Sequence, residues 1–240
     1  IYIKYILCIH YMENIIKLID GSFLLYSGKY DFDNEIYPFQ VNNNFFYLTG
    51  LEIPNLVILY NNITNKFTYF FEYKDPVWFD NFSFIDQINS QVFDIKDIEK
   101  YIVGIKKLYS LNNFENLALG LNIEYDTFSI DNICNQYRII KNKKEIENIS
   151  KACSISSNAI INIIKNRCNF NNEQEIVSYF KKQILNNNIE KMAYLPICSN
   201  GEKNSVLHYV FNKKNIPEYP QRNLVLLDIG CKYNNYCSDI

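Results

Sequence analysis

The feature that most constrains this chain is its last stretch, LVLLDIGCKYNNYCSDI, at residues 224–240. Leu224–Leu227 is a short apolar run of the kind that forms a buried strand, and Asp228 and Gly230 end it. Asn234-Asn235 tolerates the positive φ angles that a tight hairpin turn requires. The stretch therefore predicts a β-hairpin spanning residues 224–240.

Such a hairpin brings two carboxylates together. Asp239 follows Asp228 by 11 positions, and an even number of loop residues would put both side chains on one face, opposite or diagonal. Their Cβ atoms would then lie roughly 4.5–8 Å apart, a repulsive arrangement unless a cation lies between them. Spacing alone leaves two interpretations open: the pair binds one or two divalent cations, or Asp228 caps a turn while Asp239 is solvated.

Composition indicates a folded protein without a nucleic-acid signature. The chain has 240 residues, is 48% apolar and 16% aromatic, and carries a formal net charge of −2. This is enough for one or two domains, with no basic stripe for nucleic acid. Seven cysteines without a Cys-x-x-Cys pair favour reduced thiols in an intracellular compartment. The apolar opening is too short to span a bilayer and is interrupted by Lys4 and His10.

Strand and helix patterns alternate in the first 138 residues and predict a small α/β domain. Alternating apolar positions on both sides of Asn61-Asn62 predict a hairpin. Apolar residues at helical spacing predict a helix from Asp94 to Ser110. The other predicted elements are a short helix at residues 13–19 and strands at Ser22–Tyr26 and Leu117–Leu121.

A polar, basic stretch near Arg138–Asn142 predicts the boundary between two domains, residues 1–138 and 139–240. Beyond it, Lys144–Lys165 has the spacing of a long amphipathic helix. A second helix is predicted from Asn172, where Glu175 completes a capping-box pattern, to about Leu185. Strands at Met192–Cys198 and Val206–Val210 and the terminal hairpin would complete an α+β domain whose sheet carries the two aspartates.

Three segments together resemble one family, the X-prolyl aminopeptidases (aminopeptidase P) of the pita-bread metallopeptidases. YPFQVNNNFFYLTGLEIPNLVIL, residues 37–59, is similar to the family's amino-terminal domain pattern. AYLPICSNGEKNSVLHYV, residues 193–210, resembles the catalytic stretch that ends in Leu-His-Tyr, and the terminal hairpin resembles the Asp-x-Gly…Tyr-x-Ser-Asp-Ile element. The resemblance covers about residues 12–240. It implies an α/β amino-terminal domain followed by a truncated α+β pita-bread (creatinase/aminopeptidase) domain.

The resemblance also implies a metal-dependent reaction. Asp228 would be a terminal ligand of one metal ion and Asp239 a bridging ligand between two, with Mn²⁺ expected first and Zn²⁺ or Co²⁺ as alternatives. A water between the ions would become acidic and attack the peptide bond between an N-terminal residue and a following proline. The expected partner is thus a peptide or protein N-terminus.

Two further residues take roles from the resemblance. His208, in a short apolar run, is on sequence alone a satisfied, partly buried side chain; the resemblance makes it a catalytic group that hydrogen-bonds the substrate or shuttles a proton. Trp78, the only tryptophan, is a core or surface aromatic or, by resemblance, a contact near a neighbouring subunit's active site. A homo-oligomer, dimer or tetramer, is therefore expected.

The chain departs from the family pattern in places. Gln40 stands where many relatives have a basic residue, and the loop between His208 and Asp228 is about three residues longer than in many bacterial-type relatives. The pattern needs a further His and two Glu after Ile240, so we expect the 240 residues alone to be inactive.

The sequence leaves open which type of aminopeptidase the chain resembles and whether the protein is an aminopeptidase, a dipeptidase or a binding protein. FEYKDPVWFD, residues 71–80, resembles the mitochondrial type that trims processed protein N-termini, so a mitochondrial or cytoplasmic location is expected. An X-Pro dipeptidase of the same fold is one alternative. A catalytically inactive pita-bread domain used for binding is the other, although such relatives lose the ligands and Asp228 and Asp239 are both present.

Overall fold

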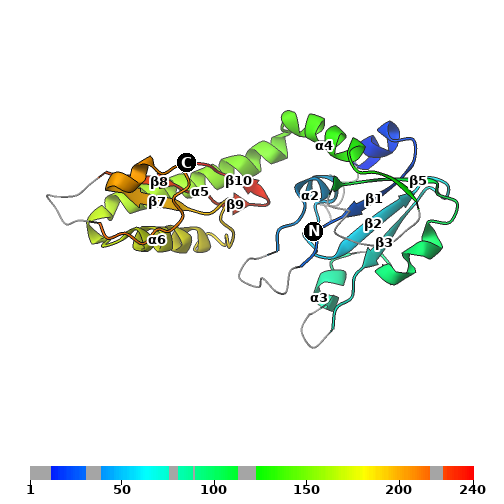
Figure 1. The fold of residues 1–240 in the computed structure, drawn as a ribbon, viewed down its shortest axis with the longest axis horizontal. Helices are drawn as coiled ribbons and strands as arrows, with labels where there is room; N and C mark the ends of the chain where they lie inside the picture. The colour runs from blue at the N-terminus through cyan, green and yellow to red at the C-terminus, as the bar shows by residue number, and fades with distance from the viewer. Residues whose placement is uncertain (1–11, 31–38, 76–80, 89, 113–122, 217–223) are drawn as a thin grey trace. The chain divides into compact units, whose positions relative to one another are not determined.

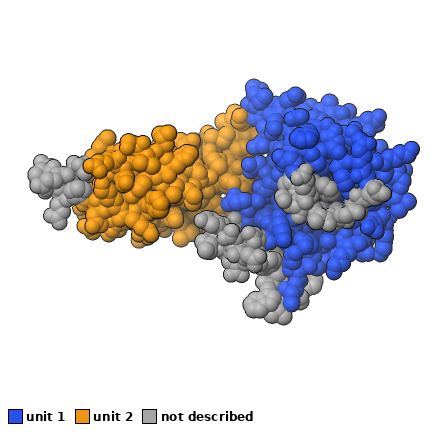
Figure 2. All heavy atoms as spheres, in the orientation of Figure 1, with its two compact units in different colours: residues 1–140 blue, residues 141–240 orange. Residues whose placement is uncertain are grey.

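The computed structural model describes residues 12–30, 39–75, 81–88, 90–112, 123–216 and 224–240. The chain forms two compact units, residues 1–140 and 141–240 (Figure 2). Trp78, His10 and the predicted strand at Leu117–Leu121 lie outside the described residues. No helix in the described ranges combines the length and the apolar character needed to cross a bilayer.

Unit 1 is built on a six-stranded mixed sheet with the strand order β4-β3-β2-β1-β5-β6 (Figure 1). The three central strands are antiparallel, and β4, β5 and β6 each add in parallel. The predicted hairpin around Asn61-Asn62 is confirmed as β2 and β3, and the predicted first strand as β1. The strands are β1 (Ser22–Tyr26), β2 (Leu56–Asn61), β3 (Lys66–Phe71), β4 (Val92–Asp94), β5 (Lys107–Ser110) and β6 (Glu124–Asp126).

Both faces of this sheet are buried. Side chains alternate along β1, so Phe23 and Leu25 join one hydrophobic cluster while Leu24 and Tyr26 join the other. The first cluster is covered by residues 12–18, which are helical, and by helices α2 (residues 43–49) and α4 (residues 129–139). The second cluster is covered by the 3-10 helix η2 (residues 95–101). A near-continuous apolar strand such as SFLLY is what burial on both faces requires. The helical elements of unit 1 are α2 (Asn43–Thr49), α3 (Asn81–Ile85), the 3-10 helix η2 (Ile95–Tyr101) and α4 (Ser129–Ile139).

The predicted helix from Asp94 to Ser110 is wrong. Asp94 caps the short η2, accepting the Lys96 N–H at 2.9 Å, and Gly104 adopts a left-handed φ of 83° between η2 and β5. The apolar spacing that resembles a helix comes from a 3-10 helix packed on the sheet, followed by a strand. Its buried members are Ile95, Ile98, Ile102 and Leu108.

Unit 2 contains the two predicted long helices. α5 (Lys143–Lys165) begins at Asn142, which forms a reciprocal capping box with Glu145. α6 (Glu173–Leu185) begins at Asn172, whose side chain accepts the Glu175 N–H at 2.9 Å. The remaining elements are η4 (Arg167–Asn169), β7 (Ile197–Asn200), η5 (Gly201–Ser205), β8 (Val225–Asp228), β9 (Lys232–Tyr233) and β10 (Tyr236–Cys237).

The β elements of unit 2 are shorter than predicted and pair differently. β8 pairs with β7, and β9 pairs with β10, both antiparallel. The apolar run Leu224–Leu227 therefore does not pair with the end of the chain, and a single hairpin over 224–240 is wrong. The predicted strand at Val206–Val210 is a turn, and in Met192–Cys198 only the last two residues belong to a strand.

Candidate metal centre

The hairpin that carries Asp239 has the predicted turn. Asn234 and Asn235 take φ angles of 47° and 63°, which is the two-residue turn that suits a twisted hairpin. The ladder starts with Tyr233 opposite Tyr236. It continues beyond β9 and β10, because Ser238 N donates to Cys231 O and Ile229 N donates to Ile240 O, each at 3.0 Å. Figure 1 shows this red hairpin beside α5.

This register determines how the two aspartates face each other. Continued from Ser238 opposite Cys231, it puts Asp239 opposite Gly230, and Asp228 lies two residues before Gly230 on the same face. Such diagonal neighbours have Cα atoms roughly 7–8 Å apart, with Cβ atoms somewhat closer. The prediction that the two carboxylates share a face agrees with the structure. Their relation is diagonal, and β7 holds the Asp228 backbone by pairing it with Ile197.

Gly230 is required for this close approach. A Cβ atom at this position would lie 2.1 Å from the Ser238 carbonyl oxygen and 3.3 Å from the Ala193 Cβ. Any side chain would push the strand that carries Asp239 away from the strand that carries Asp228. The glycine is thus needed for space.

A third residue, Tyr194, joins the two carboxylates. Its hydroxyl donates to Asp239 Oδ1 at 2.9 Å and is also within hydrogen-bonding reach of the Asp228 carboxylate. Backbone pairing brings it there: Ala193 N donates to Gly230 O at 2.9 Å on one side, and Ile197 pairs with Asp228 on the other. Burial, and then the hydrogen bonds to both carboxylates, raise the pKa of the Tyr194 phenol well above its usual range. It therefore stays a donor at neutral pH.

Tyr194 carried no signal in the sequence. It lies 34 and 45 positions before the two aspartates, within the segment AYLPICSN, and only the strand pairing shows that the three groups meet. Its hydroxyl has one proton for two carboxylates, so it offsets their repulsion only in part.

The aspartate pair fits a hard divalent cation. Asp228 Oδ1 is buried and has no hydrogen-bond partner among the described residues, an arrangement that is costly unless a cation satisfies the oxygen. Carboxylate oxygens suit Mn²⁺ and are acceptable to Zn²⁺. Within the described ranges, no three His, Cys, Asp or Glu side chains gather into a group that could hold a metal. The structure thus brings together two candidate ligands, and His208 does not join them in such a group.

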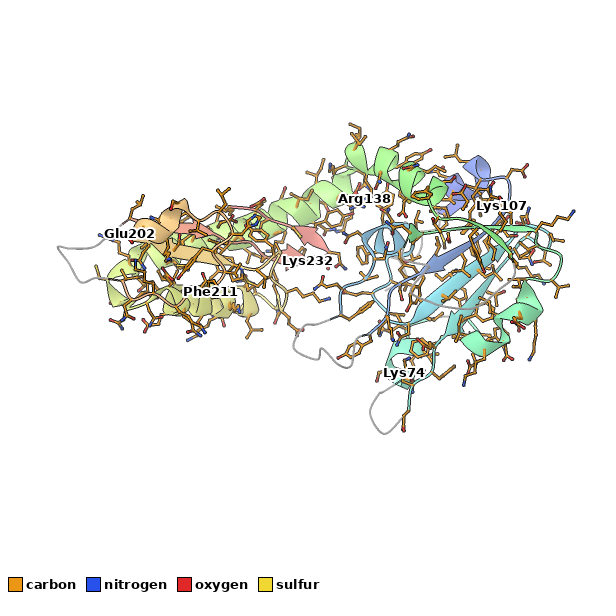
Figure 3. All side chains as sticks on the ribbon, viewed as in Figure 1. Lys74, Lys107, Arg138, Glu202, Phe211 and Lys232 are labelled. Carbon is orange, nitrogen blue, oxygen red and sulfur yellow. The ribbon has the colours of Figure 1, made fainter. Side chains whose placement is uncertain are left out.

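His208 is exposed, in a turn that follows η5. Figure 3 labels Glu202 and Phe211, which flank this segment. The neighbouring Leu207 is 88% exposed, whereas Tyr209 on the other side is buried. The interpretation of His208 as a satisfied, partly buried residue is therefore wrong. Its imidazole is free to meet a ligand from solvent.

Cys231 and Cys237 are both unbridged, and Cys231 is buried whereas Cys237 is exposed. The Cys231 thiol is buried and donates to the Ala152 carbonyl oxygen at 3.5 Å, so it serves as a core residue.

Two family models match the chain. Residues 26–109 match the N-terminal domain of aminopeptidase P, and residues 147–240 match metallopeptidase family M24. A protein of Tuber melanosporum described as a probable Xaa-Pro aminopeptidase is 29% identical over 236 residues, which cover 93% of this chain and 50% of that protein. An uncharacterized peptidase of Saccharomyces cerevisiae is 31% identical over 84% of this chain and 39% of its own length.

Solved structures show the same fold. Pseudomonas aeruginosa aminopeptidase PepP matches with a TM-score of 0.80 at 19% identity, over 97% of this chain and 60% of that one. Aminopeptidase P from E. coli, solved with the inhibitor Pro-Leu, matches with a TM-score of 0.77, also at 19% identity and 60% coverage. The present chain thus spans half or less of its curated relatives and about three fifths of these structures.

The predicted fold class, an α/β amino-terminal domain followed by part of a pita-bread domain, is confirmed by both comparisons. One family model covers strands β2, β3 and β4 and most of β5 of the unit 1 sheet, and the other covers the segment that carries Asp228, Asp239 and Tyr194. The chain belongs to the aminopeptidase P family of the M24, or pita-bread, metallopeptidases.

Proposed function

We propose that the protein is a metal-dependent aminopeptidase that hydrolyses the bond between an N-terminal residue and a following proline, or trims similar N-termini. The observation that carries the proposal is the diagonal pair of carboxylates, Asp228 and Asp239, held on one face with a buried oxygen of Asp228 left without a hydrogen bond. The names of the curated relatives supply the substrate class.

In this proposal Asp228 and Asp239 hold two divalent cations, Mn²⁺ in the first instance and Zn²⁺ or Co²⁺ as alternatives. When bound, such ions acidify a water and polarise the scissile carbonyl. Tyr194 keeps the two carboxylates oriented toward each other. His208, exposed beside the segment that leads to β8, hydrogen-bonds the substrate near the scissile bond or moves a proton.

The proposal extends to partners and place. The substrate is a peptide or protein N-terminus, and the functional form is a homo-oligomer, dimer or tetramer, with Trp78 a candidate contact. The compartment is mitochondrial or cytoplasmic.

The test uses the complete gene product, loaded with Mn²⁺ and offered a tripeptide Xaa-Pro-Xaa. Release of the N-terminal residue is expected. Asp228→Asn and Asp239→Asn should each remove bound metal and activity together, whereas His208→Asn should lower kcat and leave metal bound. Asp97→Asn, which breaks an exposed ion pair with Lys100 in unit 1, is the control that should keep both.

The same assay separates the alternatives. An X-Pro dipeptidase would cleave the dipeptide Xaa-Pro and reject the tripeptide. A catalytically inactive binding module would bind a peptide with an N-terminal Xaa-Pro but release no amino acid, with or without Mn²⁺. Either result would contradict the proposed function.

A further inference from the structure

The strongest unassigned feature of unit 2 is a buried carboxylate, Glu173, at the first position of α6. Its residue is fully buried. Taking an ionised carboxylate out of water is costly unless its oxygens are hydrogen-bonded. A glutamate in such a place therefore indicates a specific structural role.

Both oxygens of Glu173 are fully used. Oε1 accepts the Asn200 N–H at 2.9 Å and the Asn200 side-chain amide at 2.8 Å. Oε2 accepts the Tyr209 hydroxyl and the Lys214 N–H, each at 3.0 Å. One carboxylate thus ties α6 to the end of β7 and, at two points, to the loop that follows η5.

That loop carries His208 and has little backbone pairing of its own. Among the described residues, its ladder contacts lie at its end, where Asn215 bridges to Asn172. Between η5 and that bridge, side chains supply the hydrogen bonds. Asn212, at a φ of 50°, accepts the Cys198 N–H at 2.6 Å and donates to Pro196 O at 2.9 Å.

Tyr209 is the buried anchor next to His208. It is only 8% exposed, while Leu207 and His208 on its other side are exposed. Burial and the hydrogen bond to Glu173 raise the pKa of the Tyr209 phenol, so it stays protonated and keeps donating at neutral pH. Because Tyr209 is held in place, the backbone of His208, the residue directly before it, is held in place as well.

We propose that Glu173 is a positioning residue that acts through Tyr209 to hold His208 in place. The contacts of Glu173 and Tyr209 are enough to support the positioning of His208. An effect of this positioning on catalysis rests, in addition, on the proposed function. Glu173 and Tyr209 do not contact the substrate; the hydrogen bond between them selects one conformation of the segment that presents the His208 imidazole.

The first test reports on the position of His208 without requiring activity. The chain has two histidines, so His10→Gln leaves His208 as the only source of an imidazole NMR signal. In that background, Tyr209→Phe removes one hydroxyl and keeps the ring, and it is expected to shift or broaden the His208 Cε1–H signal. Glu173→Gln is also expected to shift or broaden the signal, because an amide has one acceptor oxygen. It cannot accept the two Asn200 donors together with the Tyr209 hydroxyl and the Lys214 N–H, as the carboxylate does.

The matched control is Tyr236→Phe. The Tyr236 hydroxyl donates to Glu145 Oε1 at 3.0 Å, a bond of the same kind and length in the same unit, on the hairpin and the start of α5. It should lower stability about as much as Tyr209→Phe but leave the His208 signal unchanged. An unchanged signal in Tyr209→Phe, or equal changes in both variants, would overturn the proposal.

The second test uses the complete gene product with Mn²⁺. Tyr209→Phe is expected to lower kcat by about 10-fold to 100-fold, the cost of a small misplacement of a reacting group, while KM and bound metal change little. No hydrolysis by the unmodified protein would reject the proposed function and leave the NMR result to judge the positioning. If Tyr209→Phe were fully active while His208→Asn had a lowered kcat, the positioning role of Glu173 and Tyr209 would be rejected and the proposed function would stand.

Discussion

The Tyr194 hydroxyl lies between two carboxylates that would otherwise repel each other, and this gives the site a pH dependence of its own. A phenol whose pKa is raised in the folded state stays protonated there at a pH at which it ionises in the unfolded chain. Its stabilising contribution is complete below the unfolded pKa of about 10 and is lost as pH rises above it toward the folded value.

The first prediction follows from this loss of stability with rising pH. Between pH 10 and 11.5, the free energy of unfolding should fall more steeply in the unmodified chain than in Tyr194→Phe. The difference is at most about 1.4 kcal/mol per pH unit and smaller where solvent screens the phenol. Urea denaturation at several pH values measures it. Parallel curves would contradict the inferred hydrogen bonds from Tyr194 to the two aspartates.

At the level of elements, a small buried hydrogen-bond group docks the hairpin on α5. Ser238 Oγ lies 2.7 Å from Ser156 Oγ and accepts the Cys231 N–H at 3.0 Å. Both serines are fully buried or nearly so. Ser238 immediately precedes Asp239, so this contact also fixes the backbone next to a proposed ligand.

The two serines should therefore differ when removed. Ser156→Ala deletes one hydrogen bond and is expected to lower the free energy of unfolding by about 1 kcal/mol. Ser238→Ala also leaves the buried Cys231 N–H without this acceptor and should cost about 2–3 kcal/mol. Urea denaturation followed by circular dichroism gives both values, and equal costs would contradict the asymmetric role of Ser238.

A second prediction at the level of elements concerns Gly230. Gly230→Ala places a Cβ against the Ser238 carbonyl oxygen and should cost about 3 kcal/mol or more, because backbone has to move. The control is Gly104→Ala, where the added Cβ meets only the Ile63 Cδ1 at 3.6 Å and the cost is the left-handed φ, about 1–2 kcal/mol. Thermal unfolding compares the two, and a smaller loss for Gly230→Ala would show that the two strands can separate cheaply.

The elements that could be predicted are those whose pattern is satisfied locally. α5 and α6 have amphipathic faces and side-chain caps, and β2 and β3 are joined by a short turn, so periodicity was sufficient. The predicted strand at Val206–Val210 is wrong because the geometry of this segment depends on distant partners. Glu173 holds Tyr209 from 36 positions away, which no local pattern records.

In the candidate site, too, some features follow from the local sequence and others depend on distant contacts. The turn at Asn234-Asn235 and the alternation of side chains were enough to put Asp228 and Asp239 on one face. The pairing of β8 with β7 and the approach of Tyr194 depend on contacts across 25 positions or more, so only the folded unit reveals them.

At the scale of the whole molecule, the described residues supply two carboxylates to the proposed centre and no third ligand. One of them, Asp239, is exposed and already bonded to Tyr194, whereas Asp228 keeps a buried oxygen without a partner. A cation held by so few ligands keeps most of its water and gains little from the protein.

The 240-residue chain by itself should therefore bind Mn²⁺ weakly, with a dissociation constant no tighter than about 10⁻⁴ M, the range of weak oxygen-ligand sites. Calorimetric titration measures this affinity, and Asp228→Asn should abolish what binding there is because it removes the carboxylate whose oxygen lacks a partner. Asp97→Asn, in unit 1, is the control that should bind as the unmodified chain does. Tight binding of two manganese ions would show that residues 1–240 already contain further ligands, and would contradict the two-carboxylate description of the centre.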